Sequence, residues 1–549
     1  MLYDLPELFP DTATMIRLLP RYAGWLLLPI VVLAGVLRFD MLVKRGLLYW
    51  DEGKFALEGV RILSVLISLP VVHPAGLAGK AIGTAKPGHA LLIALSYALL
   101  GVHDYAPLLM NATASVLQVV VLFFVARQFF GPHVALLAAA FLAVAGYDIV
   151  YARSALSESD ANLLFLTSVL VWSTRCKPWA TDFRPNRPAW RGIVLPAIML
   201  GAAFTVNYRL IVFIAVLVPA DLAIRWKREG WRAVTRVAAL WAVGLLLLPL
   251  AWQVIGVLAQ RHGVVLFRGE IDYLPTSYFH EVLYQLHGGK QSVVRFSPLP
   301  YLQWYTHRQG WLTFALLLLG LAIATFDRST RWVLPASLVM IPYGVYVFAP
   351  FIVPRNLDAA LPFAALLSAA ALARVLDHLR VWRARVIASA LAATAVVVVG
   401  VLQAGSLITV RSGFAQAATY LEQHGSHGAI VQNEIMRFYL RDEGRGCDAP
   451  PLPTQVASLA QDDGLGGDYA VVDNYFSPTA LYLAHHAQVV ARFATSGTTT
   501  LNEDLVASED GVPPGSQHKH FVDVFSLDKL HLPVRGLVRP QVCTLDQLP

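Results

Sequence analysis

Two adjacent carboxylates, Asp51 and Glu52, follow the first long apolar run of the sequence and precede Lys54. Acidic side chains at the mouth of a membrane helix are costly to remove from water, which makes them candidates for a functional site. The alternative is that both only cap the amphipathic helix expected at 55–67, because anions stabilise a helix N-terminus. Adjacent side chains point apart in most backbone conformations, so we do not expect the two to act as a pair.

A second acidic turn lies between two later apolar runs, where Glu158 and Asp160 follow Arg153. Both carboxylates stand at the expected start of a helix, where they could also be simple caps. If this turn and Asp51 face the same side of a membrane, the chain gathers several carboxylates at one rim of the bilayer.

Cations that suit a phosphate are expected on the same side. A departing phosphate carries negative charge, which two or three cations near the membrane surface would neutralise. Long basic side chains also reach lipid head groups without any catalytic role, and this alternative applies to each cation taken singly. The cations predicted on this face are Lys54, Lys86, Arg153, Arg209, Arg268, Lys290 and Arg355.

Membrane-spanning helices must position these side chains. The chain has 549 residues, of which 56% are hydrophobic and 14% charged, a composition typical of a membrane protein. Its apolar runs approach the roughly 20 residues that a helix needs to cross a bilayer. We predict a polytopic α-helical membrane protein with about eleven transmembrane helices, at 22–39, 105–126, 134–151, 162–174, 192–206, 210–224, 237–258, 311–326, 332–350, 357–373 and 386–410.

The basic loops predict the orientation. With the N-terminus inside, alternate loops such as 175–191, 225–236 and 374–385 carry the Arg and Lys clusters, as the positive-inside rule requires. The basic residues behind the net charge of +7 therefore set the orientation of a membrane protein. For this reason we expect no nucleic-acid partner. The apolar run 88–100 is too short to span and would invert every later loop if counted, so we predict a helix lying in the interface.

The predicted domain organisation has two parts. Residues 1–410 form the transmembrane domain, with long outer loops at 40–104 and 259–310, and residues 411–549 form a small α/β domain on the extracytoplasmic side. In that domain we expect strands at 429–432, 469–473, 489–493 and 521–525 and helices at 415–424 and 478–486. Cys447 and Cys543 both lie there, where an oxidising compartment would permit a disulfide, whereas Cys176 should be a free cytoplasmic thiol.

Four motifs in the expected order resemble the GT-C glycosyltransferases, and they extend over roughly residues 20–410. They are Asp51 to Lys54, Ala85 to His89 with the apolar run behind it, Arg153 with Glu158, and Pro354 with Arg355. The resemblance is to bacterial proteins similar to protein O-mannosyltransferases and to the lipid A aminoarabinose transferase. Where relatives commonly carry Glu, this chain has Ala85, which argues against any metal site that relatives build there.

The resemblance implies a membrane glycosyltransferase that moves a sugar from a polyprenyl-phosphate carrier to a protein, lipid or glycan acceptor. Asp51 matches the catalytic carboxylate of the family and would take the acceptor proton, and Glu158 would orient the acceptor or Asp51. Direct displacement of the phosphate should invert the anomeric centre. Predicted substrate-binding residues are Glu52, Lys54, Lys86, His89, Arg153, Asp160 and Arg355.

No cofactor beyond the lipid-linked donor is expected, and no metal ligands are assigned. The outer loop 259–310 is rich in Tyr and His, which suits a substrate lid, although aromatic residues also gather at membrane interfaces. The three His residues of this loop, at 262, 280 and 287, have no metal-type spacing, so a divalent metal lacks support.

Two other classes of protein remain open. A transporter or flippase of lipid-linked sugars would also have many spans and carboxylates near the membrane, but it should show two related halves and charged groups at mid-membrane. A noncatalytic scaffold would be indifferent to the change Asp51→Asn.

Overall fold

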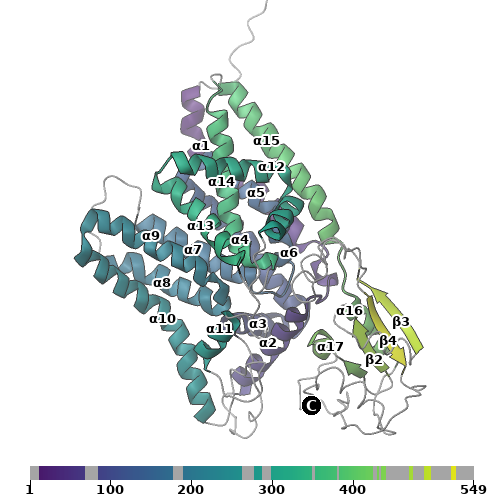
Figure 1. Ribbon diagram of the computed structural model, residues 1–549. Helices are drawn as coiled ribbons and strands as arrows, with labels where there is room; N and C mark the ends of the chain where they lie inside the picture. The colour runs from purple at the N-terminus through teal and green to yellow at the C-terminus, as the bar shows by residue number, and fades with distance from the viewer. Residues whose placement is uncertain are drawn as a thin grey trace, which may run out of the picture.

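The computed structural model is mostly helical, with a small sheet near the C-terminus (Figure 1). It describes residues 12–68, 85–176, 189–261, 277–286, 298–348, 353–379, 382–424, 429–431, 434–439, 469–473, 488–495 and 521–526. The helices up to residue 206 are α1 (Thr12–Phe39), α2 (Trp50–Ser68), α3 (Pro87–Leu100), α4 (Tyr105–Phe130), α5 (Pro132–Ala143), α6 (Gly146–Ala152), α7 (Glu158–Cys176) and α8 (Ala189–Val206), with the short η1 (Leu42–Lys44) after α1.

The chain continues with a second group of helices that ends where the sheet region begins. They are η3 (Tyr208–Leu210), α9 (Ile211–Glu229), α10 (Trp231–Arg261), α11 (Tyr278–Leu286), α12 (Leu299–Phe326), α13 (Thr330–Tyr346), η4 (Pro354–Ala360), α14 (Leu361–Leu376) and α15 (Trp382–Ile408). The predicted run 311–326 begins directly after Gly310, whose φ of 80° breaks α12. This kink separates the polar, aromatic first part of the helix from its apolar second part.

Within the described residues, 6 helices are long and apolar enough to cross a membrane, or up to 7 if the bent pair α5 and α6 is one span. A multi-pass membrane protein is therefore confirmed. The helices α7, α8, α9 and α13 coincide with the remaining predicted runs but do not meet this criterion. The count of eleven spans stays a prediction.

A buried arginine stabilises the break between α5 and α6, which bend by 59° at this point. Arg38 donates hydrogen bonds to the carbonyl oxygens of Leu142 and Ala143 and pairs with Asp148 of α6. A helix break inside a membrane leaves carbonyl groups without partners, and a nearby donor removes that cost. Arg38 and Asp148 are therefore structural, although they are charged groups within the helical bundle.

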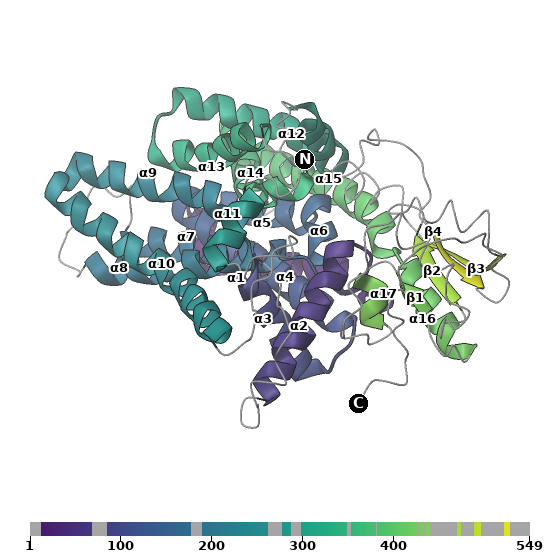
Figure 2. The same cartoon turned by 60° about the horizontal axis from the view of Figure 1, so that its bottom comes forward.

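The first outer loop folds onto one end of the bundle. Helix α3 buries its His89 face against α2, α4 and α8, while Leu95 and Leu99 stay exposed. An apolar helix of 14 residues with an exposed apolar face suits the predicted interfacial position. Figure 2 shows α2 and α3 at the side of the molecule that comes forward, with α17 (Glu434–Tyr439) beside α2.

The C-terminal strands form one mixed sheet in the order β1-β2-β4-β3. The strands are β1 (Ala429–Val431), β2 (Tyr469–Asp473), β3 (Gln488–Ala494) and β4 (Phe521–Ser526), and only the β1–β2 pair is parallel. Helix α16 (Gly413–Gln423) packs on β3 and β4. The four predicted strands and the helix predicted at 415–424 are confirmed, whereas the helix predicted at 478–486, Cys447 and Cys543 lie outside the described residues.

Candidate functional site

Asp51 and Arg355 form an ion pair between two parts of the chain that lie far apart in sequence. Asp51 lies in the first turn of α2 and Arg355 in η4, and the Arg355 Nη1 donates to Asp51 Oδ2 at 2.6 Å. The Asp51 side chain is 38% exposed, so it remains open to a substrate. Burial raises the pKa of Asp51, but Arg355, Lys86 and Lys54 outweigh burial and hold that pKa below its usual value. Asp51 is therefore ionised at neutral pH.

Glu158, at the N-terminus of α7, faces two further cations. Its Oε1 lies 4.0 Å from the Nζ of Lys86 and 3.7 Å from the Nη1 of Arg209. Asn207 donates a longer hydrogen bond of 3.4 Å to the same oxygen. Burial raises the pKa of Glu158, and Lys86, together with Arg355 and Arg209, lowers it below its ordinary value.

Lys86 is held from several sides. Its Nζ donates to Ser157 Oγ at 2.8 Å and lies 5.1 Å from the ring centre of Phe55 and 6.0 Å from that of Tyr208. Aromatic faces attract a cation while excluding water from it. Burial lowers the pKa of Lys86 to about 7, although Glu158 acts in the opposite direction.

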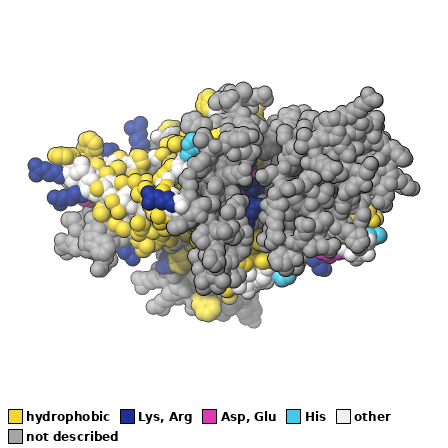
Figure 3. Space-filling model, turned by 90° about the horizontal axis from the view of Figure 1, so that it is seen from below, with side chains coloured by type: hydrophobic (Ala, Val, Ile, Leu, Met, Phe, Trp, Pro, Cys, Tyr) yellow, Lys and Arg dark blue, Asp and Glu magenta, His cyan; other side chains and the backbone are white. Residues whose placement is uncertain are grey.

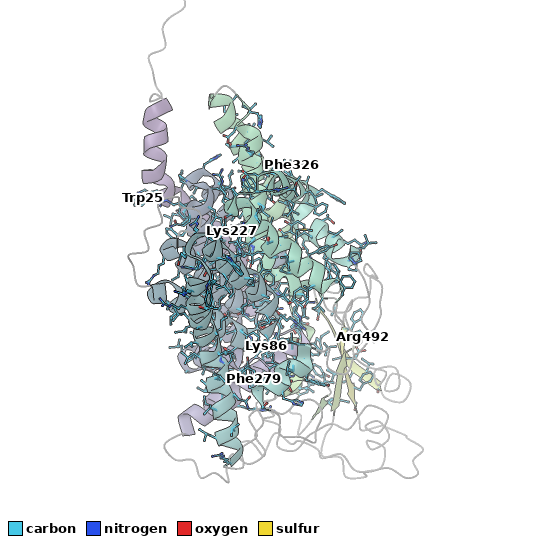
Figure 4. All side chains as sticks on the ribbon, turned by 60° about the vertical axis from the view of Figure 1, so that its left-hand side comes forward. Trp25, Lys86, Lys227, Phe279, Phe326 and Arg492 are labelled. Atoms are coloured by element: carbon cyan, nitrogen blue, oxygen red, sulfur yellow. The ribbon has the colours of Figure 1, made fainter. Side chains whose placement is uncertain are left out.

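These contacts define one group of charges, the rim cluster, which consists of Asp51, Lys86, Glu158, Arg209 and Arg355. Figure 4 shows Lys86 toward the lower end of the helical bundle, whereas Phe326, at the end of α12, lies near its upper end. Seen from below, Lys and Arg side chains are visible near the middle of that face (Figure 3). The rim cluster thus brings together one residue from each of the four sequence motifs, namely Asp51, Lys86, Glu158 and Arg355.

Glu52 is bonded within the protein, whereas we predicted that it binds substrate. It is fully buried and accepts hydrogen bonds from Arg45 Nη1 at 2.9 Å, Tyr49 N at 2.8 Å and Ala155 N at 2.8 Å, in addition to Leu48 N. Its two oxygens are thus occupied by the protein itself. Glu52 ties the loop before Asp51 to the turn before Glu158, and we assign it this structural role in place of substrate binding.

Arg153 also lies outside the rim cluster. Its guanidinium donates to the carbonyl oxygens of Arg38 at 3.1 Å, Asp40 at 2.8 Å and Ile408 at 3.0 Å, and the residue is buried. These oxygens stand at the C-terminal ends of α1 and α15, where helices leave carbonyl groups unpaired. The predicted contact of Arg153 with substrate is therefore corrected to a capping role that joins two helices.

His89 and Asp160 bind each other behind the rim cluster. The His89 Nδ1 lies 3.1 Å from Asp160 Oδ2, and its Nε2 donates to the Ala155 carbonyl oxygen at 3.0 Å. Both residues are buried, and burial raises the pKa of Asp160. This pair fastens α3 to the turn that carries Glu158, so neither side chain is directed at the rim cluster. Lys54, one turn along α2 from Asp51, contributes to the low pKa of Asp51.

Arg209 is the residue that sequence reasoning placed on this face but did not select for the site. Its signal was a short outward turn between two apolar runs, which alone does not separate a substrate contact from a lipid contact. Ser157, Asn207 and Tyr208 were missed because uncharged side chains give no comparable signal. Their contribution depends on the fold bringing α7 and α8 together.

Among the residues that the structure describes, no group of three or more His, Cys, Asp and Glu side chains is placed to hold a metal ion. Of the three His residues in the predicted lid, only His280 belongs to the described residues, where it is exposed on α11. A reaction without a metal stays a prediction.

The chain is similar to known membrane proteins. The family model described as dolichyl-phosphate-mannose-protein mannosyltransferase matches residues 83–254, a segment that contains Lys86, Glu158 and Arg209. ArnT from Cupriavidus metallidurans, in its crystal structure bound to undecaprenyl phosphate, is 16% identical to this chain in sequence. The match has a TM-score of 0.60 and covers 93% of this chain and 99% of that chain. The chain has the fold of the GT-C glycosyltransferases.

Further structures share this fold. The apo form of the same ArnT is also 16% identical, with a TM-score of 0.61 over 92% of this chain and 98% of that chain. The archaeal oligosaccharyltransferase AglB from Archaeoglobus fulgidus, in complex with an inhibitory peptide and a dolichol-phosphate, is 14% identical, with a TM-score of 0.53 over 74% of this chain and 58% of that chain. A comparison with curated proteins finds no match to the sequence.

Proposed function

We propose that this protein is an inverting glycosyltransferase that moves a sugar from a polyprenyl-phosphate carrier to an acceptor at the outer face of the cytoplasmic membrane. The observation that carries the proposal is the rim cluster, in which Arg355 pairs with an ionised, partly exposed Asp51 while Lys86 and Arg209 face Glu158. An eleven-span topology with this cluster and the C-terminal domain outside is part of the same proposal. The acceptor is a protein, a lipid or a cell-envelope glycan.

The leaving phosphate would be bound by Lys86, Arg209 and Arg355. Hydrogen bonds between a cation and a phosphate oxygen are strong, and a guanidinium can bind two oxygens at once. Glu158, which we expected to orient the acceptor or Asp51, contacts Lys86 and Arg209 instead. We assign it the role of holding these two cations in position for the phosphate.

Asp51 would act as the base. The oxygen or nitrogen of the acceptor attacks the anomeric carbon, the bond from that carbon to the phosphate oxygen breaks, and its electron pair leaves with the phosphate. Asp51 takes the acceptor proton, and the configuration at the anomeric carbon inverts. A glycosidase needs a second carboxylic acid to protonate its leaving alcohol, but a phosphate leaves without a proton.

The ion pair with Arg355 connects phosphate binding to this step. Arg355 holds the pKa of Asp51 low, which makes Asp51 a weak base. A bound phosphate competes for the Arg355 guanidinium and so raises the basicity of Asp51. The base would become effective only when the donor is in place.

The known structures support a lipid phosphate as the carrier. ArnT is seen bound to undecaprenyl phosphate, and AglB is seen with a dolichol-phosphate and an inhibitory peptide. No cofactor beyond the lipid-linked donor is part of the proposal. The position of the charges at one end of the bundle favours an enzyme over a transporter, which needs its binding site near the middle of the membrane.

The test is release of prenyl phosphate by the purified protein from a panel of prenyl-phosphate sugars. We expect the wild type to turn over at least one donor, and Asp51→Asn to reduce turnover about 10²- to 10⁴-fold, the usual contribution of a general base. Asp40→Asn is the matched control, because it is the same change at an exposed residue of the same loop outside the rim cluster. Equal turnover by Asp51→Asn and the wild type would remove the basis of the proposal.

A further inference from the structure

The loop that leads into Asp51 is fixed by the C-terminal part of the chain. The backbone N–H of Leu47 donates to the Tyr439 hydroxyl oxygen at 2.9 Å, and the N–H of Ser412 donates to the Arg45 carbonyl oxygen at 2.7 Å. Leu48 and Tyr49 donate to Glu52 in the same stretch. The backbone immediately before Asp51 is therefore bonded at nearly every residue, partly by segments more than 360 residues away.

Tyr439, the last residue of α17, bonds in two directions. While its hydroxyl oxygen accepts from Leu47, the hydroxyl donates to Asp104 Oδ2 at 2.8 Å. Asp104 directly precedes α4, one of the long membrane helices. One hydroxyl thus links the loop before Asp51, the C-terminal region and the membrane bundle.

Gly46 allows this close approach. Its φ of +71° is unfavourable for other residues, and a Cβ there would lie 2.8 Å from the Tyr439 hydroxyl oxygen and 3.0 Å from the Cβ atoms of Ala415 and Ser412. A side chain at this position would push the loop away from both C-terminal contacts.

The rest of α17 packs on the helices of the same outer loop. The ring of Phe438 stacks on that of Tyr97 in α3, with ring centres 6.2 Å apart. Tyr97 in turn packs against Gly59, because a Cβ at Gly59 would lie 3.2 Å from its ring. Helix α17 therefore contacts α3 and α2, the two helices that carry Lys86 and Asp51 at their starts.

We propose that Tyr439 is a positioning residue for Asp51. Through it, α17 of the C-terminal region holds the loop before Asp51 in the position that the active site needs. This proposal rests on the proposed function, since it assigns a role relative to the base. Tyr439 touches neither the rim cluster nor the reacting atoms in any contact described above. It acts by fixing the Leu47 backbone, four residues before Asp51.

The central variant is Tyr439→Phe, which keeps the ring and its packing but removes the hydroxyl from Leu47 and Asp104. We expect turnover of the prenyl-phosphate sugar to fall about 10- to 100-fold, since a displacement near 1 Å has effects of this size. The dissociation constant for undecaprenyl phosphate should stay within about twofold of the wild type, because the phosphate ligands are untouched. Hydrogen exchange at residues 46–50 should become faster.

Two further variants make the test specific. Tyr420→Phe is the matched control, because Tyr420 lies in α16 and its ring contacts His424, Tyr469 and Phe493 within the C-terminal region. It should leave turnover and exchange unchanged. Gly46→Ala disturbs the same contact from the loop side and should reproduce the loss of turnover with retained binding of undecaprenyl phosphate.

The outcomes separate this proposal from the proposed function. If Asp51→Asn abolishes turnover but Tyr439→Phe and Gly46→Ala turn over like the wild type, Tyr439 does not position Asp51 and the glycosyltransferase proposal stands. If both Tyr439 and Gly46 variants lose phosphate binding in parallel with turnover, the positioning role is also overturned in favour of general unfolding of the site. Retained turnover by Asp51→Asn would instead remove the base that Tyr439 is proposed to position.

Discussion

Burial and the neighbouring carboxylates act in opposite directions on the pKa of Lys86. Burial, together with the nearby Arg209 and Arg355, lowers this pKa to about 7, although Glu158 and Asp51 act to raise it. Below that pH the side chain is a cation that can bind a phosphate, and above it the amine is neutral. The charge of the proposed phosphate site therefore changes within the physiological range of pH.

The affinity for undecaprenyl phosphate should weaken as the pH rises above about 7. An anionic ligand binds the protonated form of Lys86 more tightly and raises the pKa of Lys86 in the complex. Between the pKa of Lys86 in the free protein and this raised pKa, each pH unit therefore costs up to about tenfold in affinity. The measurement is the dissociation constant between pH 6 and pH 9.

Lys86→Arg is the control for this pH dependence. Arginine stays charged over the whole range, so only the ionisation of the phosphate itself should remain in the profile. An identical pH profile for the wild type and Lys86→Arg would show that Lys86 does not titrate in the binding step.

Residue types and their order along the chain were enough to predict that Asp51, Lys86, Glu158 and Arg355 gather on one face, because charged groups at the edges of apolar runs are costly to bury and few. They were not enough to separate these residues from Glu52 and Arg153. A buried carboxylate whose oxygens are occupied by backbone N–H groups has the same sequence signature as one that faces a substrate. Only the packing of the turn at 153–158 against the loop before Asp51 distinguishes them.

At the scale of elements, the contact between α8 and α10 sets the position of Arg209. A Cβ at Gly201 of α8 would lie 2.6 Å from the Leu245 carbonyl oxygen, and a Cβ at Gly244 of α10 would lie 2.4 Å from the Cβ of Ala197. Small residues allow membrane helices to approach closely. Helix α8 ends at Val206, three residues before Arg209. A shift of α8 would therefore move Arg209 relative to Glu158 in the rim cluster.

Gly201→Val should therefore destabilise the protein and weaken phosphate binding together. Overpacking of a tight contact costs about 1–3 kcal/mol, and the displaced end of α8 would carry Arg209 away from Glu158. The measurements are the midpoint of thermal unfolding in detergent and the dissociation constant for undecaprenyl phosphate.

Gly344→Val in α13 is the matched control, because a Cβ at Gly344 has no neighbour within 4 Å. It should change neither quantity. A stable Gly201→Val protein with wild-type affinity would show that α8 does not transmit its position to Arg209.

Many of the elements followed from hydrophobic runs and turn residues, as the apolar helix predicted to begin at 311 and the strand at 469–473 illustrate. What the runs could not predict is the break between α5 and α6 inside the single predicted span 134–151. That break depends on Arg38, which supplies hydrogen bonds from another helix. A hydrogen-bond donor that lies far away in sequence does not change the local hydrophobic pattern.

At the scale of the whole molecule, the orientation in the membrane is a prediction that follows from the basic loops. In a variant with all three Cys residues replaced, a single cysteine at Gln416 should react with a membrane-impermeant maleimide in intact cells. A single cysteine introduced by Arg228→Cys, in the last turn of α9, should react only after permeabilisation. Both positions are exposed, so accessibility within the protein does not limit either reaction.

The reverse labelling pattern would place the C-terminal region in the cytoplasm. The rim cluster would then lie on the inner side as well, because α17 bonds to the loop before Asp51. The overall arrangement is thus tested independently of any substrate.

The most direct test of the account is a structure of this protein with undecaprenyl phosphate bound. We expect the phosphate oxygens within hydrogen-bonding distance of Lys86, Arg209 and Arg355, with Asp51 released from its ion pair and open to the acceptor. A phosphate bound away from these three cations, with the Asp51–Arg355 pair intact, would contradict the central claim.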